Sequence, residues 1–329
     1  MVAAEESRRD RPLALATAIE NLEYLLRLKG ESVESVPLLR RALEIKVKEL
    51  GPDHPALAIP LRNLGRVLWQ QRNYDEAEVE FRRALTIGER AGDQASEFVS
   101  EILYTLGLLL RDKGDFVGAE PVVWRALALE EKIHGADHAN CAAVLETLAW
   151  LRRAQGDLKG SEPLIRQALS AKERVCKPND PALATTLANL AVTLEENGNT
   201  AEAETLLRRA LLINEAALGA NDHAVGLTLF NLATLQWKRG RFTEAEPLYR
   251  RALRIYEKVF GSEHAETANV IAMLARVLSL TGDFVGAQLL AGRAYDIAAR
   301  TLGEKHPTTV AMKDHLNALM MQLAPAHSN

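Results

Sequence analysis

Apolar residues recur along this chain at helical spacing, in pairs of neighbouring stretches. In one such pair the apolar positions are Leu57, Leu61, Leu64, Val67 and Leu68 in the first stretch and Ala77, Phe81, Ala84, Leu85 and Ile87 in the second. Residues three and four apart share one helix face, so each stretch predicts an amphipathic helix. Neither helix can cover its apolar side alone. The pattern therefore predicts a helix–turn–helix hairpin that packs against further hairpins.

This pattern repeats every 42 residues without slippage. An alanine returns at Ala42, Ala84, Ala126, Ala168, Ala210, Ala252 and Ala294, and a leucine at Leu22, Leu64, Leu106, Leu148, Leu190, Leu232, Leu274 and Leu316. Where the first helix of a unit should end, the chain has Gly30, Gly114, Gly156, Gly198, Gly240 and Gly282, a series that only Arg72 breaks. Glycine suits a helix end because it accepts positive φ.

The 42-residue frame predicts one repeat domain over about residues 13–324, with a short extension at 1–12 and a tail at 325–329. Its units span about 13–50, 51–93, 94–135, 136–177, 178–219, 220–261 and 262–303, and a terminal helix follows at 304–324. Stacked hairpins bury one continuous core, so we expect a single domain despite the length of 329 residues.

The repeat unit resembles that of a known family. A small residue after Leu64, followed by Ala77, Phe81 and Ala84, resembles the tetratricopeptide repeat (TPR) signature. The 42-residue unit with LGPDHPALA, NLG, YDEAE and RRAL is similar to the repeats of kinesin light chains and their bacterial relatives. The resemblance covers about residues 13–324 and implies an all-α TPR α-solenoid of about seven repeats. It also implies a right-handed superhelix whose inner groove is lined mainly by the first helix of each unit.

One departure from kinesin light chains stands at the N-terminus. Kinesin light chains carry a long heptad segment that binds the motor chain, whereas only about a dozen residues precede the first repeat here. We therefore do not expect a working kinesin light chain.

Four histidines share one position of the 42-residue frame, at His54, His138, His264 and His306, and Ser96, Asp180 and Asp222 hold that position in other units. Ser and Asp are favoured caps of a helix start, and Pro, which follows at Pro55, Pro181 and Pro307, is favoured at the first helical position. Stacked helices lie roughly 10 Å apart, whereas zinc ligands lie about 2 Å from one metal. This column therefore predicts helix caps, and the sequence predicts no metal site.

Composition narrows the class of protein. Hydrophobic residues make up 47% and aromatic residues 5%, so the core is expected to consist of Leu, Ala and Val, which favour helix. The net charge of −4 argues against nucleic-acid binding, and Arg-rich RRAL copies are balanced by i,i+4 pairs such as Glu78–Arg82. The sequence contains no stretch long and apolar enough for a membrane span or signal peptide. With two cysteines, it predicts a cytoplasmic protein without membrane contact.

Motifs of catalysis are missing from the sequence. It has no GxSxG, GxxxxGK[ST], GxGxxG or HExxH. His138 and Cys141 are three residues apart and could share a helix face, but Cys141 stands in a column with Leu57, Val99, Leu183 and Val225, which favours a core position. We therefore expect a non-enzymatic protein that needs no cofactor.

The resemblance implies which side chains line the inner groove. They are Tyr24, Arg62, Asn63, Arg66, Trp69, Tyr104, Trp150, Arg153, Asn189, Phe230, Asn231 and Trp237, and the same columns include Arg276. Trp, Tyr and Arg often anchor interfaces, and Asn can bond a peptide backbone regardless of its side chains. We expect a scaffold that binds an extended or short helical peptide, with Arg62, Arg66 and Arg153 favouring an acidic segment. The alternative is that Trp69, Trp150 and Trp237 are partly buried against neighbouring helices and bind nothing.

The terminal helix suggests a second class of function. Its apolar residues Leu316, Leu319, Met320 and Leu323 have no second helix to cover them, and Met-rich surfaces are common at interfaces. The alternative function is thus a self-assembly module that forms a homodimer through this helix. An enzyme or a small-molecule receptor is the least favoured reading, because the columns show no convergent polar cluster.

Overall fold

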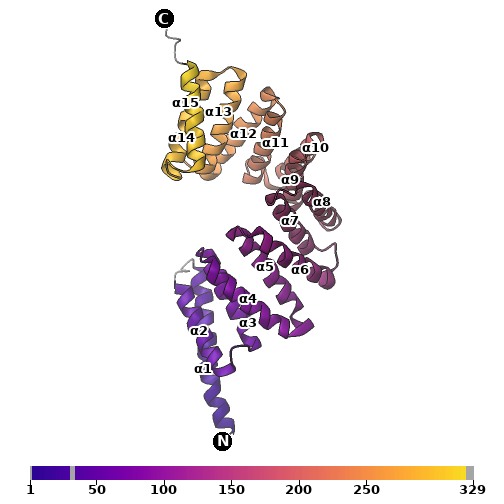
Figure 1. Ribbon diagram of the computed structural model, residues 1–329, viewed down its shortest axis with the longest axis vertical. Helices are drawn as coiled ribbons and strands as arrows, with labels where there is room; N and C mark the ends of the chain where they lie inside the picture. Colours follow the sequence, from indigo (N-terminus) through magenta and orange to yellow (C-terminus); the bar gives the residue numbers. More distant parts are fainter. Residues whose placement is uncertain (1, 30–33, 324–329) are drawn as a thin grey trace. The chain divides into compact units, whose positions relative to one another are not determined.

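The computed structural model describes residues 2–29 and 34–323, which form fifteen α-helices and two short 3-10 helices without a β-strand (Figure 1). The first helices of the hairpins are α1 (Val2–Leu28), α3 (Ala58–Gln70), α5 (Ser96–Lys113), α7 (Ala139–Ala154), α9 (Pro181–Glu196), α11 (His223–Lys238) and α13 (Ala265–Thr281). The second helices are α2 (Ser35–Leu50), α4 (Tyr74–Arg90), α6 (Phe116–His134), α8 (Leu158–Val175), α10 (Thr200–Leu218), α12 (Phe242–Phe260) and α14 (Phe284–Thr301). Helix α15 (Pro307–Leu323) follows, and the 3-10 helices η2 (Pro55–Leu57) and η3 (Gly92–Ala95) precede α3 and α5.

These elements confirm the all-α fold of seven hairpins and a terminal helix. Helix α1 begins at Val2, so most of the expected N-terminal extension continues the first helix. The packing divides into two compact units, of which unit 1 ends at Ala171 and unit 2 begins at Lys172. Within each unit a helix packs against its neighbours in the chain, as α3 does against α2 and α4, and α13 against α12 and α14.

Small residues let the two helices of a hairpin approach closely. A Cβ atom placed on Gly65 would lie 2.8 Å from the Phe81 ring, and one on Gly107 would lie 2.2 Å from Cγ2 of Val123. Both distances are too short for van der Waals contact. Gly65 and Gly107, which directly follow Leu64 and Leu106 of the leucine series, thus set the helix–helix distance within these two hairpins.

The histidine column caps helices, as the sequence predicts. Nδ1 of His54, His138, His264 and His306 accepts a hydrogen bond from the backbone N–H two residues later, at 3.1, 3.2, 3.2 and 3.3 Å. Asp180 and Asp222 do the same through Oδ1 at 2.8 Å. Ser96 corrects the expectation for its unit, because it is the first residue of α5 and makes no capping bond. There η3 leads directly into the helix, so the chain enters α5 already coiled.

The turn between the helices of a hairpin requires positive φ. Gly114, Gly156, Gly198, Gly240 and Gly282 have φ between 73° and 94°. Arg72, which replaces glycine in that series, has φ of 61°, the one non-glycine residue in the described part of the chain with positive φ. Arg72 therefore adopts the same turn conformation as the glycines, although positive φ is unfavourable for a residue with a side chain.

One hydrophobic cluster of the core of unit 2 is formed by the apolar faces of α11, α12, α13 and α14. Tyr249 is its largest fully buried side chain, and its hydroxyl lies 2.8 Å from Oγ1 of Thr234. Burial raises the pKa of Tyr249 to about 12, because the phenolate would lose its hydration. Leu319 of α15 belongs to the same core, so the terminal helix covers the end of this stack.

Candidate functional site

In unit 1, contacts within the protein hold the expected tryptophan anchors. The Trp69 indole N–H donates to Oδ2 of Asp112 at 3.1 Å, and Arg111 donates to Oδ1 of the same carboxylate at 2.8 Å. The Arg111 guanidinium also lies 5.5 Å from the Trp150 ring centroid, and Phe116 meets that ring edge to face at 5.5 Å. Trp150 keeps 39% of its surface exposed. This arrangement fits the alternative in which the two indoles mainly pack against neighbouring helices.

The arginines that we expect in the groove of unit 1 differ in whether they form an ion pair. Arg62 forms an ion pair with Glu101 at 2.8 Å, and its guanidinium lies 5.8 Å from the Phe98 ring centroid. Arg66 is exposed and forms no ion pair within the described residues. Of the other expected residues, Tyr24 is exposed on α1, and Oδ1 of the half-buried Asn63 on α3 accepts a hydrogen bond from Arg62 at 3.4 Å. Tyr104 contacts Oγ1 of Thr147 at 3.2 Å, and Arg153 is half-buried on α7. Contacts within unit 1 therefore occupy Arg62, Asn63 and Tyr104.

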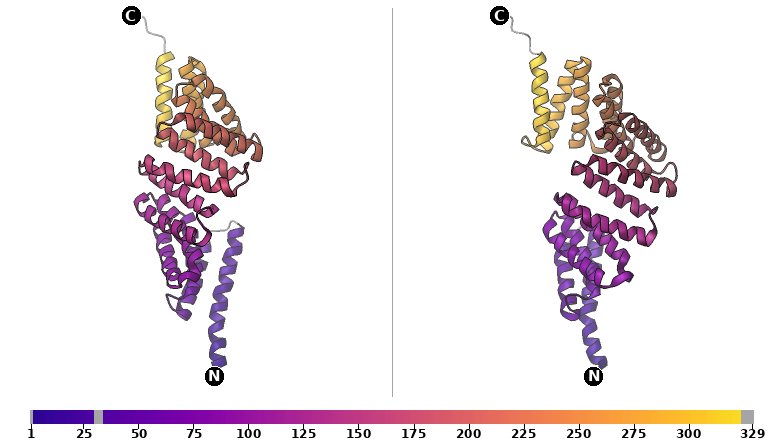
Figure 2. Two further views of the ribbon diagram at one scale, coloured as in Figure 1. Left: turned by 90° about the vertical axis from the view of Figure 1, so that its right-hand side faces the viewer. Right: turned by 45° about the vertical axis from the view of Figure 1, so that its right-hand side comes forward.

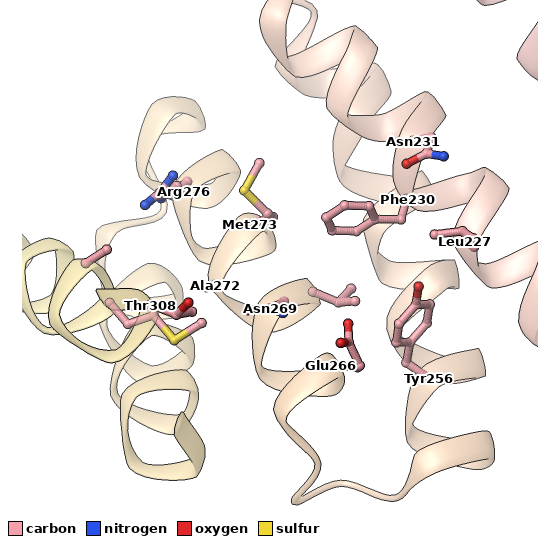
Figure 3. Close-up of a pocket in the computed structure, with 13 residues that line it drawn as sticks. Leu227, Phe230, Asn231, Tyr256, Glu266, Asn269, Ala272, Met273, Arg276 and Thr308 are labelled. Carbon is pink, nitrogen blue, oxygen red and sulfur yellow. The ribbon is translucent and has the colours of Figure 1, made fainter. Parts of the chain in front are cut away.

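Unit 2 contains a pocket of about 360 Å³ between α11, α12, α13 and α15, which we call the Arg276 pocket (Figure 3). It is lined by Leu227, Phe230 and Asn231 of α11, Tyr256 of α12, Glu266, Asn269, Val270, Ala272, Met273 and Arg276 of α13, and Thr308, Ala311 and Met312 of α15. Two of the expected groove residues, Phe230 and Asn231, thus lie together with Arg276 in one pocket.

The polar groups of this pocket are unsatisfied. The side chains of Arg276, Asn231 and Asn269 are half-buried, and among the described residues none of them forms a hydrogen bond or an ion pair. Glu266 lies ten residues before Arg276 on α13, which places it roughly 15 Å away along the helix axis. Figure 3 shows the two side chains at opposite ends of the pocket. The pocket therefore has a cationic end, an anionic end and an apolar middle.

The positive charge of Arg276 affects the protonation of the neighbouring His315. Burial lowers the pKa of His315, and the nearby Arg276 charge lowers it further. His315 therefore stays neutral at neutral pH and adds no second cation. A half-buried guanidinium without a carboxylate partner favours an anionic group that enters the pocket.

A smaller pocket of about 140 Å³ adjoins the first. It shares Phe230 and Asn231 with the Arg276 pocket and extends to Lys238 of α11 and Glu195 of α9, whose ion pair measures 2.8 Å. The two remaining expected residues of unit 2 lie outside both pockets. Trp237 packs against the core, and Asn189 is exposed on α9. Phe230 and Asn231 therefore separate two hollows on one face of unit 2.

Sequence reasoning missed part of this lining. Tyr256 comes from a second helix and Met312 from the terminal helix, neither of which belongs to the expected groove columns. Met273 could have been found, since it stands 42 residues after Asn231 in the column of Asn63 and Asn189. Its position in the 42-residue frame was the only signal, because Thr105 and Thr147 also interrupt the asparagines of that column.

Metal-binding clusters and cysteine thiols are the other groups that could carry chemistry. Within residues 2–29 and 34–323 no group of three or more His, Cys, Asp or Glu side chains is arranged to hold a metal ion. Cys141 is fully buried, and burial together with Glu130 and Glu131 raises the pKa of its thiol. That thiol is thus a core side chain. None of the described helices has the length and apolar character needed to cross a lipid bilayer.

The terminal helix places its apolar residues on different sides. Leu319 is 2% exposed and, with Leu316, packs into the core of unit 2. Met320 is half exposed, and the side chain of Leu323 lies outside the described residues. Leu319 is therefore part of this core, Leu316 is partly buried against it, and self-association through this helix stays a prediction.

Comparison with known proteins identifies the repeats. The sequence model of the tetratricopeptide repeat matches residues 15–90, 98–174, 153–216, 182–258 and 227–300. In structure, the chain is similar to BtubC (BKLC) from P. vanneervenii, with a TM-score of 0.61 and 21% identity over 71% of this chain and 94% of that one. It is also similar to the putative kinesin light chain repeats of P. anserina (TM-score 0.54, 22% identity, 61% and 94% covered).

A third similar structure is a Rap protein complexed with competence and sporulation factor (TM-score 0.51, 14% identity, 98% of each chain covered). At these identities the likeness concerns the fold alone. No protein of curated function matches the chain in sequence.

Proposed function

Because the chain belongs to the tetratricopeptide repeat family, whose repeats generally serve as protein-interaction scaffolds, we propose that it is a non-enzymatic scaffold that binds a peptide segment of a partner protein. We place the main contact in the Arg276 pocket and its neighbour across Phe230 and Asn231. A fold of this kind can hold a bound factor, as in the Rap protein complex.

The observation that supports this proposal is that, among the described residues, the side chains of Arg276, Asn231 and Asn269 have no hydrogen-bond or ion-pair partner. An acidic side chain or a terminal carboxylate of the peptide would pair with Arg276, while Asn231 and Asn269 would bond its backbone. The apolar middle around Phe230 and Met273 would take one bulky apolar side chain. The segment we expect therefore combines an acidic and a large apolar residue. Arg62 contributes less to this preference, because Glu101 already neutralises it.

A peptide-display selection on the whole protein tests the proposal. Random peptides selected on the wild type should share an acidic residue near a bulky apolar one. The Arg276→Gln variant should bind a selected peptide at least about tenfold more weakly, since a hydrogen bond to a charged group contributes about 1.5–3 kcal/mol. Binding should also weaken as salt concentration rises.

Arg254→Gln is the matched control, because Arg254 is exposed on α12 and does not line either pocket. It should bind the selected peptide like the wild type. If Arg276→Gln binds equally well, or the selection yields no shared acidic residue, the proposal is wrong.

A further inference from the structure

One face of α1 is apolar but uncovered. In the 42-residue frame, Leu15, Ala18, Leu22 and Leu25 of α1 correspond to Leu57, Pro60, Leu64 and Val67, which lie in α3 and at the end of η2 directly before it. The α3 residues are all buried, and Leu64 is 2% exposed. Leu22, its equivalent, is 49% exposed, and Leu15 and Leu25 are 47% and 56% exposed. We call these four α1 residues the α1 face.

The difference lies in the helices that pack beside α1 and α3. Helix α2 of the preceding hairpin packs against α3, whereas the described residues include no helix in the equivalent place beside α1. Helix α1 buries its other side, with Ala16 and Ile19, against Ala42 of α2. Figure 2 shows α1 at the edge of unit 1, with its N-terminal turns extending beyond the neighbouring helices. The α1 face therefore keeps the apolar residues of an interior repeat without their cover.

The α1 face is also free of charge. Only two charged residues occur between Leu13 and Leu26, and both lie on the α2 side. Glu20 forms an ion pair with Lys46, with 2.6 Å between Oε1 and Nζ, and Glu23 is 2% exposed. In a chain with 26% charged residues, an exposed helix face without charge is unusual. A charged partner surface would find no residue of opposite charge on the α1 face. A second α1 face carries no charge either, so two such faces would not repel each other.

The opposite end of the chain is built differently. The positions of α15 that a following second helix would cover are Val310, Lys313, Asn317 and Met320. Lys313 and Asn317 are polar and exposed, and the Lys313 ammonium lies 5.6 Å from the Tyr295 ring centroid. A polar outer face is the usual end of a repeat stack. Contact between α15 and the α1 face of another copy would place an ammonium against leucines, which disfavours head-to-tail chains of copies.

We propose that the α1 face is a self-association surface, on which α1 of a second copy of this chain docks to form a closed dimer. The residue spacing of three, four and three from Leu15 to Leu25 is that of the apolar core positions in a two-helix coiled coil. The contact uses the same face on both copies, so it closes after two chains and leaves neither α1 face exposed. The contact involves none of the residues of the Arg276 pocket, so dimerisation can be tested independently of peptide binding.

Sedimentation equilibrium of the full chain, from about 1 to about 100 µM, tests this proposal. The wild-type mass should rise with concentration towards two chains and no further. The Leu22→Glu/Leu25→Glu variant should remain a monomer, because four carboxylates would meet in the contact. The uncharged Leu22→Ala/Leu25→Ala variant should dimerise at least about tenfold more weakly.

The matched control is Val285→Glu/Leu289→Glu, which alters two residues of α14 that are 73% and 74% exposed. It should dimerise like the wild type, and circular dichroism should show the same helix content in all four proteins. A wild type that stays monomeric at the highest concentration overturns the proposal. So does a glutamate variant of the α1 face that dimerises normally, or a wild-type mass that grows beyond two chains.

Discussion

Replacing Arg72 by glycine should stabilise the second repeat. Arg72 has φ of 61°, and its backbone N–H donates to the carbonyl oxygen of Trp69 at 2.9 Å, so the turn is formed in full. An L-residue in this left-handed region costs roughly 1–2 kcal/mol. Glycine removes that cost but loses about 0.5–1 kcal/mol through the greater freedom of the unfolded chain. The net gain we expect from Arg72→Gly is therefore about 0.5–1 kcal/mol.

Two further variants separate backbone strain from side-chain effects. Arg72→Ala keeps the Cβ atom and should change stability little, because the Arg72 side chain forms no hydrogen bond or ion pair within the described residues. Gly156→Ala is the converse change. No atom lies within 4 Å of the Cβ position there, so its expected loss of about 1 kcal/mol is conformational alone.

Hydrogen exchange measures this change locally, which suits a stack of repeats that need not unfold in one step. The Asn73 amide donates to the carbonyl oxygen of Leu68 at 2.9 Å across the turn. Its exchange in Arg72→Gly should slow by about threefold to fivefold, which corresponds to about 0.6–1 kcal/mol. Unchanged or faster exchange in Arg72→Gly, together with a neutral Gly156→Ala, would refute the assignment of strain to this turn.

Three other changes test the same structure. His54→Asp should raise the urea midpoint slightly, by about 0.5 kcal/mol, because Asp is a stronger cap than His and its charge favours a helix start; a lower midpoint would contradict the capping role. Gly107→Ala should destabilise by about 1–3 kcal/mol through the clash with Val123, and adding Val123→Ala should recover part of that loss in thermal melts. The Tyr249 pKa of about 12 exceeds its ordinary 10, so its stabilising contribution is complete below pH 10 and lost as pH rises towards 12. Absorbance at alkaline pH should therefore show Tyr249 ionising together with the loss of helix signal, and ionisation well before unfolding would contradict its burial.

Local sequence rules predicted most of the fold. A histidine cap acts on an N–H two residues away, and a turn glycine is needed wherever φ is positive, so both are visible in a single repeat. The small-residue column could likewise be derived, because Gly107 must accommodate Val123 of the same hairpin. The prediction was wrong for Ser96. The helical turn η3 directly precedes α5, so the chain is already helical before the position at which the frame predicts a cap.

The candidate site was predicted less completely, because its state depends on neighbouring hairpins. Arg62 and Glu101 are 39 residues apart, and Trp69 and Asp112 are 43 residues apart. These contacts provide polar partners for Arg62 and Trp69. The 42-residue frame predicted that both side chains lie on the inner face, but it could not predict these partners. Arg276 stands in the column of Arg66 and Trp150, but no part of its own sequence indicates that it lacks an acidic partner.

The sequence by itself determined the repeat, its helices, their caps and the family, because these depend on periodicity and on contacts within a few residues. The tertiary structure alone decided which equivalent positions are covered. Leu22 and Leu64 occupy the same place in the 42-residue frame, yet one is half exposed and the other buried. The physical reason is that burial in a stack is supplied by the adjacent hairpin, and a residue at the end of the stack has the same pattern without that neighbour.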